Sequence, residues 1–137
     1  MQDEKRHEVM AWMKKAQDDL RTARVAVEAD PPLIESALFH CQQAVEKAMK
    51  TFLAAHDTPF RKTHNLDELA VACEKIDNTL KVIFNSARDL TVFAWEFRYP
   101  GDSETPPLEE AYDAITTAQA VIETVQSRLP ECFRKKV

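Results

Sequence analysis

The sequence predicts an all-α protein, an up-and-down bundle of four long helices plus one short helix. A single glycine occurs in 137 residues, which leaves few positions for tight β-hairpin turns, because such turns need residues with positive φ. Apolar residues recur at helical spacing, about 3.6 residues per turn, in segments that prolines and polar residues separate. The chain length fits one domain over residues 1–137.

The first helix is expected from Val9 to about Val27. Its apolar residues lie on one helical face. They are Val9, Trp12, Met13, Ala16, Leu20, Ala23 and Val27. The Asp30-Pro31-Pro32 sequence ends this helix, because proline lacks a backbone N–H and disfavours the α conformation of the residue before it.

The second helix is expected from about Leu33 to His56, with a wide apolar face. That face consists of Ile34, Ala37, Leu38, Cys41, Ala44, Val45, Ala48, Phe52 and Ala55. Phe39, Met49 and Leu53 lie outside it, on one flank. A helix with apolar residues on a second side is either central in a bundle or part of a subunit interface. We expect both, with these three side chains contacting a second copy of the chain.

Two helices are expected between residue 65 and Pro100. Asn65 and Glu68 have the spacing of a capping box, which opens a short helix. Asp77 or Asn78 can cap a fourth helix that ends near the Phe97-Arg98-Tyr99-Pro100 sequence. Its apolar positions are Leu80, Ile83, Phe84, Ala87, Leu90 and Ala94.

The last helix is expected from about Pro106 to Leu129. Pro106 and Pro107 suit its first turn, since the first N–H groups of a helix have no intrahelical partner. Pro130 ends it. No internal repeat or low-complexity segment interrupts the bundle.

Composition excludes several classes of function. The net charge of −5 disfavours non-specific binding to nucleic acid or to an anionic membrane, because both depend on a basic surface. Gly101 alone cannot form a glycine-rich phosphate loop. The charged start and the lack of an apolar run of about 20 residues predict a cytoplasmic protein.

The sequence predicts neither a metal site nor a cofactor. Cys41, Cys73 and Cys132 are widely spaced, so neither a disulfide framework nor a thiolate zinc site is expected, and Cys41 and Cys73 fall on apolar stripes. The Glu-x-x-His spacing of a di-metal bundle occurs once, at Glu4 and His7, where two copies are needed. No serine or cysteine has the neighbours of an activated nucleophile, so no catalytic residue is assigned.

Two places combine cations with histidine or aromatic residues. The loop from His56 to His64 also contains Arg61 and Lys62, and it either binds phosphate or is simply solvated. Arg98 follows an aromatic-rich stretch, where it either recognises a phosphate or a base plane or holds helix-terminal carbonyls.

Three segments together resemble the HEPN domain (higher eukaryotes and prokaryotes nucleotide-binding). They are Phe39-His-Cys-Gln-Gln-Ala-Val-Glu-Lys-Ala-Met-Lys50, Thr63-His-Asn-Leu-Asp-Glu-Leu69 and Arg98-Tyr-Pro100. The resemblance covers roughly residues 8–130. It implies a helical bundle, commonly a homodimer, often encoded beside a minimal nucleotidyltransferase in a prokaryotic two-component or toxin–antitoxin module.

Many HEPN proteins are metal-independent ribonucleases with the signature Arg, four to six residues, then His. No arginine of this chain is followed by histidine at that spacing: Ser103, Glu104 and Thr105 follow Arg98 there. His64 comes only three residues after Arg61. The resemblance therefore does not carry nuclease activity onto this chain. The residues that match the family's recurring polar positions are Gln43, Glu46, Lys47, His64, Arg98 and Tyr99.

We therefore expect a dimeric HEPN-like partner of a minimal nucleotidyltransferase, with a nucleotide or RNA end bound by these polar residues. The alternative is a toxin-like ribonuclease with a rearranged site, in which His64 or His40 acts as acid or base and Arg98 or Arg61 stabilises the phosphorane. A nucleotide-binding module without a partner is a third reading.

Overall fold

The structure is a computed structural model that describes residues 3–94 and 105–133. Within these ranges the chain forms helices and connecting loops, and no strand. Three long helices dominate, α1 (Asp3–Glu28), α2 (Ile34–Ala55) and α5 (Leu108–Arg128). The shorter elements are α3 (Leu66–Ile76), η1 (Asn78–Leu80), α4 (Lys81–Ala87), η2 (Arg88–Ala94) and η3 (Glu131–Phe133).

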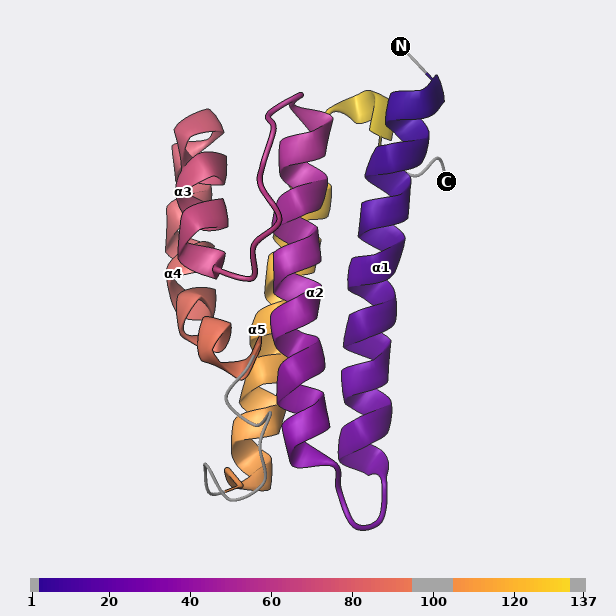
Figure 1. Cartoon of the computed structure of the whole chain (residues 1–137), viewed down its shortest axis with the longest axis vertical. Helices are drawn as coiled ribbons and strands as arrows, with labels where there is room; N and C mark the ends of the chain where they lie inside the picture. Colours follow the sequence, from indigo (N-terminus) through magenta and orange to yellow (C-terminus); the bar gives the residue numbers. More distant parts are fainter. Residues whose placement is uncertain (1–2, 95–104, 134–137) are drawn as a thin grey trace.

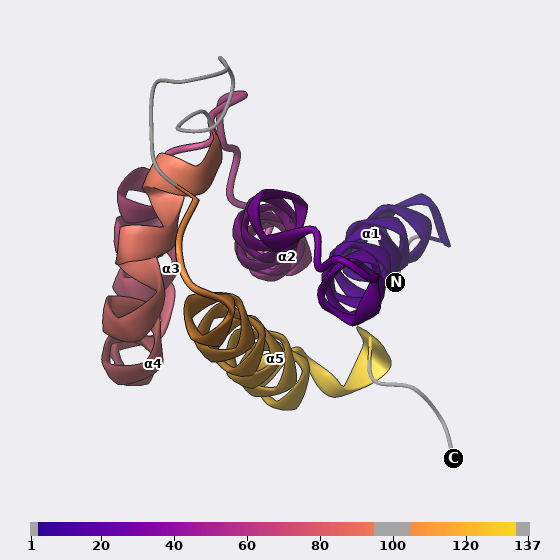
Figure 2. The ribbon, with the colours of Figure 1, turned by 90° about the horizontal axis from the view of Figure 1, so that it is seen from below.

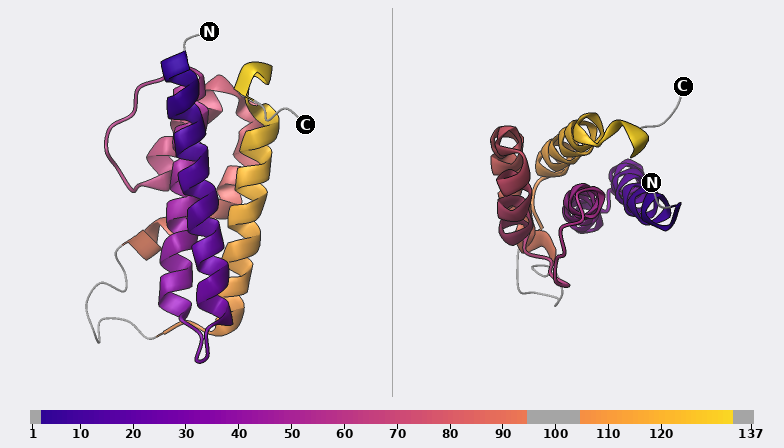
Figure 3. Two further views of the ribbon diagram at one scale, coloured as in Figure 1. Left: turned by 90° about the vertical axis from the view of Figure 1, so that its right-hand side faces the viewer. Right: turned by 90° about the horizontal axis from the view of Figure 1, so that it is seen from above.

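Helix α2 is the centre of the bundle (Figure 1). Seen along its axis, α1 lies on one side of α2, α3 and α4 lie on the other side, and α5 covers a third (Figures 2 and 3). The fourth side of α2, opposite α5, is covered in part by the loop of residues 57–65 that leads to α3 (Figure 2). This placement explains why α2 has the widest apolar surface, since three helical neighbours pack against it.

The predicted core faces of α1 and α2 are confirmed, and only Trp12 and Ile34 of these faces are partly rather than fully buried. Buried side chains follow the helical spacing of the sequence, for example Val9, Met13, Ala16 and Leu20 in α1. Helix α1 begins before Val9, at Asp3. Arg6 donates to the backbone oxygen of Cys132 (3.2 Å), which joins the start of α1 to η3. No helix in the described part of the chain is long and apolar enough to cross a bilayer.

The predicted helix caps are confirmed in part. Asn65 is the N-cap of α3, and its side chain accepts from the N–H groups of Asp67 and Glu68. The capping box is not completed, because the Asn65 N–H donates to Thr63 Oγ1 and the Glu68 carboxylate binds Arg61. At the next element Asp77, rather than Asn78, is the cap.

The predicted fourth helix changes its hydrogen-bonding pattern along its length. Residues 78–94 are helical throughout, as a 3₁₀ turn, the short α4 and a second 3₁₀ stretch. In the last part the buried residues Ala87, Leu90 and Phe93 are three apart. A 3₁₀ helix has three residues per turn and places such residues on one line, whereas an α-helix would spread them. The end predicted near Pro100 lies outside the described residues.

The expected contact between two copies through Met49 and Leu53 is wrong for these two residues. Both are fully buried inside the single chain. Cys73 of α3 donates its thiol hydrogen to the backbone oxygen of Met49 (3.6 Å), so α3 covers this flank of α2. Phe39 is the one member of the predicted trio that remains exposed, at 38%.

Candidate functional site

The loop of residues 57–65 returns along α2 because of the way α2 ends. Asp57 has a positive φ of 53°. The N–H of Asp57 donates to Ala54 O (3.2 Å), and that of Thr58 donates to Leu53 O (2.9 Å). This is the Schellman arrangement, in which one left-handed residue satisfies the last carbonyls and reverses the chain direction. The reversal brings His64 back to the middle of α2, eighteen residues after Glu46 in sequence.

Glu46 is the centre of a buried polar cluster, which we define as Gln42, Gln43, Glu46, Lys50 and His64. The Glu46 side chain is 3% exposed. Its Oε1 lies 2.7 Å from His64 Nδ1 and 3.3 Å from Gln42 Nε2, and its Oε2 accepts from Lys50 Nζ at 2.9 Å. A buried carboxylate is stable only when paired and hydrogen-bonded, and these three donors meet that need.

Two glutamines connect this cluster to the loop backbone. Gln42 Nε2 donates to His64 O (3.0 Å), and Gln43 Nε2 donates to Gln42 Oε1 (2.5 Å). The polar groups of α2 thus hold His64 at both its ring and its carbonyl. Because Gln42, Glu46 and Lys50 are four residues apart, they form one line along the helix under the loop.

Two aromatic rings cover Lys50. Its Nζ lies 5.4 Å from the ring centroid of Trp12 and 5.7 Å from that of Phe60. The two rings meet edge to face, with centroids 5.9 Å apart. The ammonium is therefore paired with Glu46 and stabilised by cation–π contact with both rings. Trp12 of α1 and Phe60 of the loop are held at fixed positions as a result.

The His64 ring projects from this cluster to the surface. Its side chain is 61% exposed, although Nδ1 lies against a buried carboxylate. This pairing sets the orientation of the ring and leaves Nε2 away from Glu46. A carboxylate that orients an imidazole in this way is found in acid–base sites and in phosphate-binding sites.

The cations of the loop are not equally available. Arg61 makes a bidentate pair with Glu68, from Nε at 2.9 Å and from Nη2 at 2.7 Å. This hydrogen bonding raises the pKa of Arg61 and lowers the pKa of the Glu68 carboxyl. Lys62 is exposed and forms no ion pair with any described residue. Lys62 is thus the loop cation that is available to a phosphate.

Lys47 belongs to a neighbouring cluster. The Asp19 carboxylate of α1 accepts a hydrogen bond from Lys47 Nζ (2.5 Å). Its other oxygen lies 2.8 Å from His40 Nδ1. These contacts join α1 to α2. His40, a candidate acid or base of the alternative reading, is held by Asp19, whereas Arg61 of the loop is held by Glu68.

The structure brings together three of the six predicted ligand-binding residues, namely Gln43, Glu46 and His64. Lys47 lies beside them in the Asp19 cluster. Arg98 and Tyr99 lie outside the described residues. Gln42 and Lys50 were not among the predicted site residues, although their spacing of four from Glu46 places both on its side of the helix.

The remaining candidate chemistry is weaker. Cys41 and Cys73 are buried as expected, and burial raises the pKa of the Cys41 thiol to about 12. No group of three potential metal ligands occurs within the described ranges.

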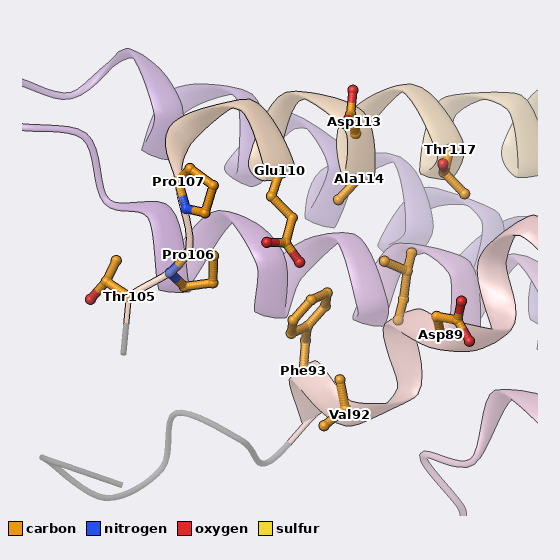
Figure 4. A pocket seen from close by; sticks show the side chains of 11 residues that line it. Asp89, Val92, Phe93, Thr105, Pro106, Pro107, Glu110, Asp113, Ala114 and Thr117 are labelled. Atoms are coloured by element: carbon orange, nitrogen blue, oxygen red, sulfur yellow. The ribbon is translucent and has the colours of Figure 1, made fainter. Parts of the chain in front are cut away.

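A cavity between η2 and α5 is lined by three carboxylates, Asp89, Glu110 and Asp113, beside Phe93 (Figure 4). Carboxylates repel phosphate, so this cavity is not a site for a nucleic-acid end.

The comparison with protein families gives a match. The model of the HEPN domain matches residues 9–128. No curated protein and no solved structure matches the chain. The match spans α1 through the end of α5 and includes the whole polar cluster around Glu46. The chain belongs to the HEPN domain family.

Proposed function

We propose that this HEPN protein binds the phosphate of a nucleotide or an RNA end at His64 and Lys62 without cutting RNA. In the same proposal it acts as a homodimer and as the partner of a minimal nucleotidyltransferase. One observation carries the binding function: Glu46 fixes the His64 ring from below, so that Nε2 faces outward. An exposed Lys62 two residues earlier supplies positive charge.

The pairing of Arg61 and Arg88 favours binding over cleavage. In the ribonuclease signature of the family an arginine acts together with the histidine, and it stabilises the charge that develops on phosphorus. Arg61 holds both oxygens of the Glu68 carboxylate through its Nε and Nη2. Arg88 pairs with Asp67 and Glu74. Neither guanidinium can turn to a phosphate beside His64 without first giving up these carboxylates.

Two observations support the proposed homodimer and the proposed partner. They are the family resemblance and one exposed aromatic residue. Phe39 is an exposed aromatic residue of the central helix. Exposed aromatic residues are enriched where proteins bind one another. The resemblance to HEPN proteins encoded beside nucleotidyltransferases supplies the class of the partner.

The second candidate function is a ribonuclease with a rearranged site. The Glu46–His64 pair favours it, because an oriented imidazole can exchange a proton with a 2′-hydroxyl or a leaving oxygen. Arg98 or Arg61 would then stabilise the phosphorane. For Arg61 this requires release of Glu68.

Calorimetric titration tests the binding proposal. The purified protein is titrated with AMP and with a short RNA carrying a 5′-phosphate, and the same RNA without the phosphate serves as the reference. We expect binding that depends on the phosphate and that weakens about tenfold in His64→Gln, since one charge-assisted hydrogen bond is lost. Arg98→Ala tests the contribution of Arg98. Equal affinity for both RNAs would contradict the proposal.

Co-expression tests the partner. The protein is produced with the nucleotidyltransferase from an adjacent reading frame, and complex formation is measured by size-exclusion chromatography with light scattering. We expect one complex that contains two copies of this chain. Separate elution of the two proteins would contradict this part of the proposal without affecting phosphate binding.

A further inference from the structure

A second cavity lies beside the polar cluster, between α1, the end of α2 and the loop. Its volume is about 540 Å³, a size that suits a small ligand such as a nucleotide. Trp12 and Phe60 form aromatic walls, and Lys50 lies beneath both rings. Glu8 of α1 and Asp57 and Lys62 of the loop also line it, and the Asp57 carboxylate is paired with Lys5 (2.6 Å). The cavity therefore combines aromatic faces with charges of opposite sign.

We infer that this cavity is the base subsite for a purine nucleotide, with the base against Trp12 and Phe60 and the phosphate at Lys62, the cavity residue that lies two positions before His64 in the chain. The inference rests on the proposed function, because it names the class of nucleotide that the His64 surface binds. Aromatic side chains bind bases by stacking, and purines offer the larger π surface.

The aromatic walls are already in place for a ligand. Lys50 holds both rings through cation–π contact, and Glu46 in turn fixes Lys50. Binding then costs little ordering of these side chains, which raises affinity. The same Glu46 carboxylate orients His64, so one buried group positions both the base subsite and the phosphate subsite.

The charges at the mouth set the direction of the ligand. Glu8 is exposed on α1, and no described residue forms an ion pair with it. A carboxylate repels phosphate and accepts hydrogen bonds from an exocyclic amino group, as adenine carries. Lys62 attracts the phosphate. The base amino group thus lies toward α1 and the phosphate toward the loop.

Titrations with AMP, UMP and ribose 5-phosphate test the subsite. We expect AMP to bind at least several-fold more tightly than UMP or ribose 5-phosphate. Trp12→Leu should weaken AMP binding about tenfold and leave ribose 5-phosphate unchanged, because only the stacking contact is removed. Trp12→Phe should retain most of the affinity for AMP, since it keeps an aromatic ring. It is the matched control for Trp12→Leu, because it also makes the side chain smaller.

The phosphate end has its own matched pair of variants. Lys62→Gln should weaken the binding of AMP several-fold, and it should weaken the binding of ribose 5-phosphate by the same factor. Lys81→Gln, at an exposed lysine on α4, is the control and should change neither.

The outcomes separate this inference from the proposed function. AMP binding that depends on His64 and is unchanged in both Trp12 variants overturns the base subsite and leaves phosphate binding standing. Equal affinities for AMP and ribose 5-phosphate in the wild-type protein also overturn it. Failure of AMP, ribose 5-phosphate and 5′-phosphorylated RNA to bind overturns both.

Discussion

His64 Nδ1 lies 2.7 Å from Oε1 of Glu46, and this contact joins an exposed imidazole to a buried carboxylate. The Oε2 of the same carboxylate binds Lys50. Glu46 therefore balances a buried cation and orients a surface ring at the same time. Stability and ligand binding are coupled through this residue, and substitutions around it should separate the two.

Replacement of Lys50 tests the stability side of this coupling. Lys50 and Glu46 are an almost fully buried ion pair. Lys50→Met should lower the free energy of unfolding by roughly 3–5 kcal/mol, because it leaves Glu46 buried without its cation. Urea denaturation followed by circular dichroism measures the loss. In the double variant Lys50→Met/Glu46→Gln much of it should return, and equal losses in the single and the double variant would contradict the explanation.

His56 should make stability depend on pH near neutrality. Its Nε2 is buried and has no hydrogen-bond partner among the described residues, and the ring packs on Phe52 with centroids 4.4 Å apart. Burial lowers its pKa from the usual 6.5, and Lys5 adds to this effect, while Asp77 and Asp57 oppose it.

The sign of the effect follows from proton binding. Below pH 6.5 the unfolded chain takes up a proton at His56 more readily than the folded chain does, so the free energy of unfolding falls as pH falls. Thermal melts between pH 7.5 and pH 5.5 should show a decrease that is smaller in His56→Gln. The carboxyls of Asp18, Glu68 and Asp77, whose pKa values are lowered, act below this range. Identical slopes for both proteins would contradict the assignment.

Substitutions on α2 should distinguish a core position from a dimer contact. Leu53→Asp places an unpaired charge in the core and should prevent folding, as circular dichroism would show. Phe39→Asp alters an exposed residue and should keep the fold. If Phe39 is a dimer contact, light scattering at tens of micromolar should give a dimer for the wild type and a monomer for Phe39→Asp.

The control for this experiment is another exposed apolar residue. Val82 on α4 is 83% exposed, and Val82→Asp should change neither the fold nor the mass. A monomeric wild-type protein would remove the dimer from the proposed function. A Leu53→Asp variant that still folds would contradict the burial of Leu53 in the core of the single chain.

The periodicity of apolar residues predicted the helices, because a helix that is buried on one face has apolar residues at regular spacing along the sequence. It also showed that Met49 and Leu53 have an apolar environment, but not whether α3 or a second copy provides it. Residues 88–94 form a 3₁₀ helix instead of continuing α4. The buried residues Ala87, Leu90 and Phe93 are three apart, and this spacing favours 3₁₀ geometry. Leu80, Phe84 and Ala87, earlier in the same predicted helix, have α-helical spacing, so the change of helix type after Ala87 was not predicted.

The candidate site was predictable in part. Gln43 and Glu46 were identified with His64 through the family resemblance. Lys50 was missed because its significance depends on Trp12 and Phe60, which lie 48 residues apart and meet only through the fold. Contacts across that separation depend on how the loop turns at Asp57, and no periodic pattern encodes them.

The last prediction concerns RNA cleavage, where the chain departs from the ribonuclease signature of its family. Cleavage without metal requires a group that removes the 2′-hydroxyl proton or protonates the leaving oxygen, and in the family's signature an arginine stabilises the phosphorane. His64 has the orientation for the first task, but Arg61 is bound by Glu68. The positions that the signature reserves for histidine after Arg98 hold Ser103, Glu104 and Thr105.

The purified protein should therefore show no cleavage of single-stranded or structured RNA above a buffer control in the presence of a chelator. Glu68→Gln is the informative variant, because it weakens the pairing of Arg61 beside His64 while leaving His64 and Glu46 intact. If Arg61 can serve the rearranged site, this variant should gain measurable cleavage, and the gain should disappear in Glu68→Gln/His64→Ala. Cleavage by the wild-type protein that co-elutes with it and is lost in His64→Ala would instead establish the ribonuclease as its function, since the Glu46–His64 pair would then be working with a cation in the native chain.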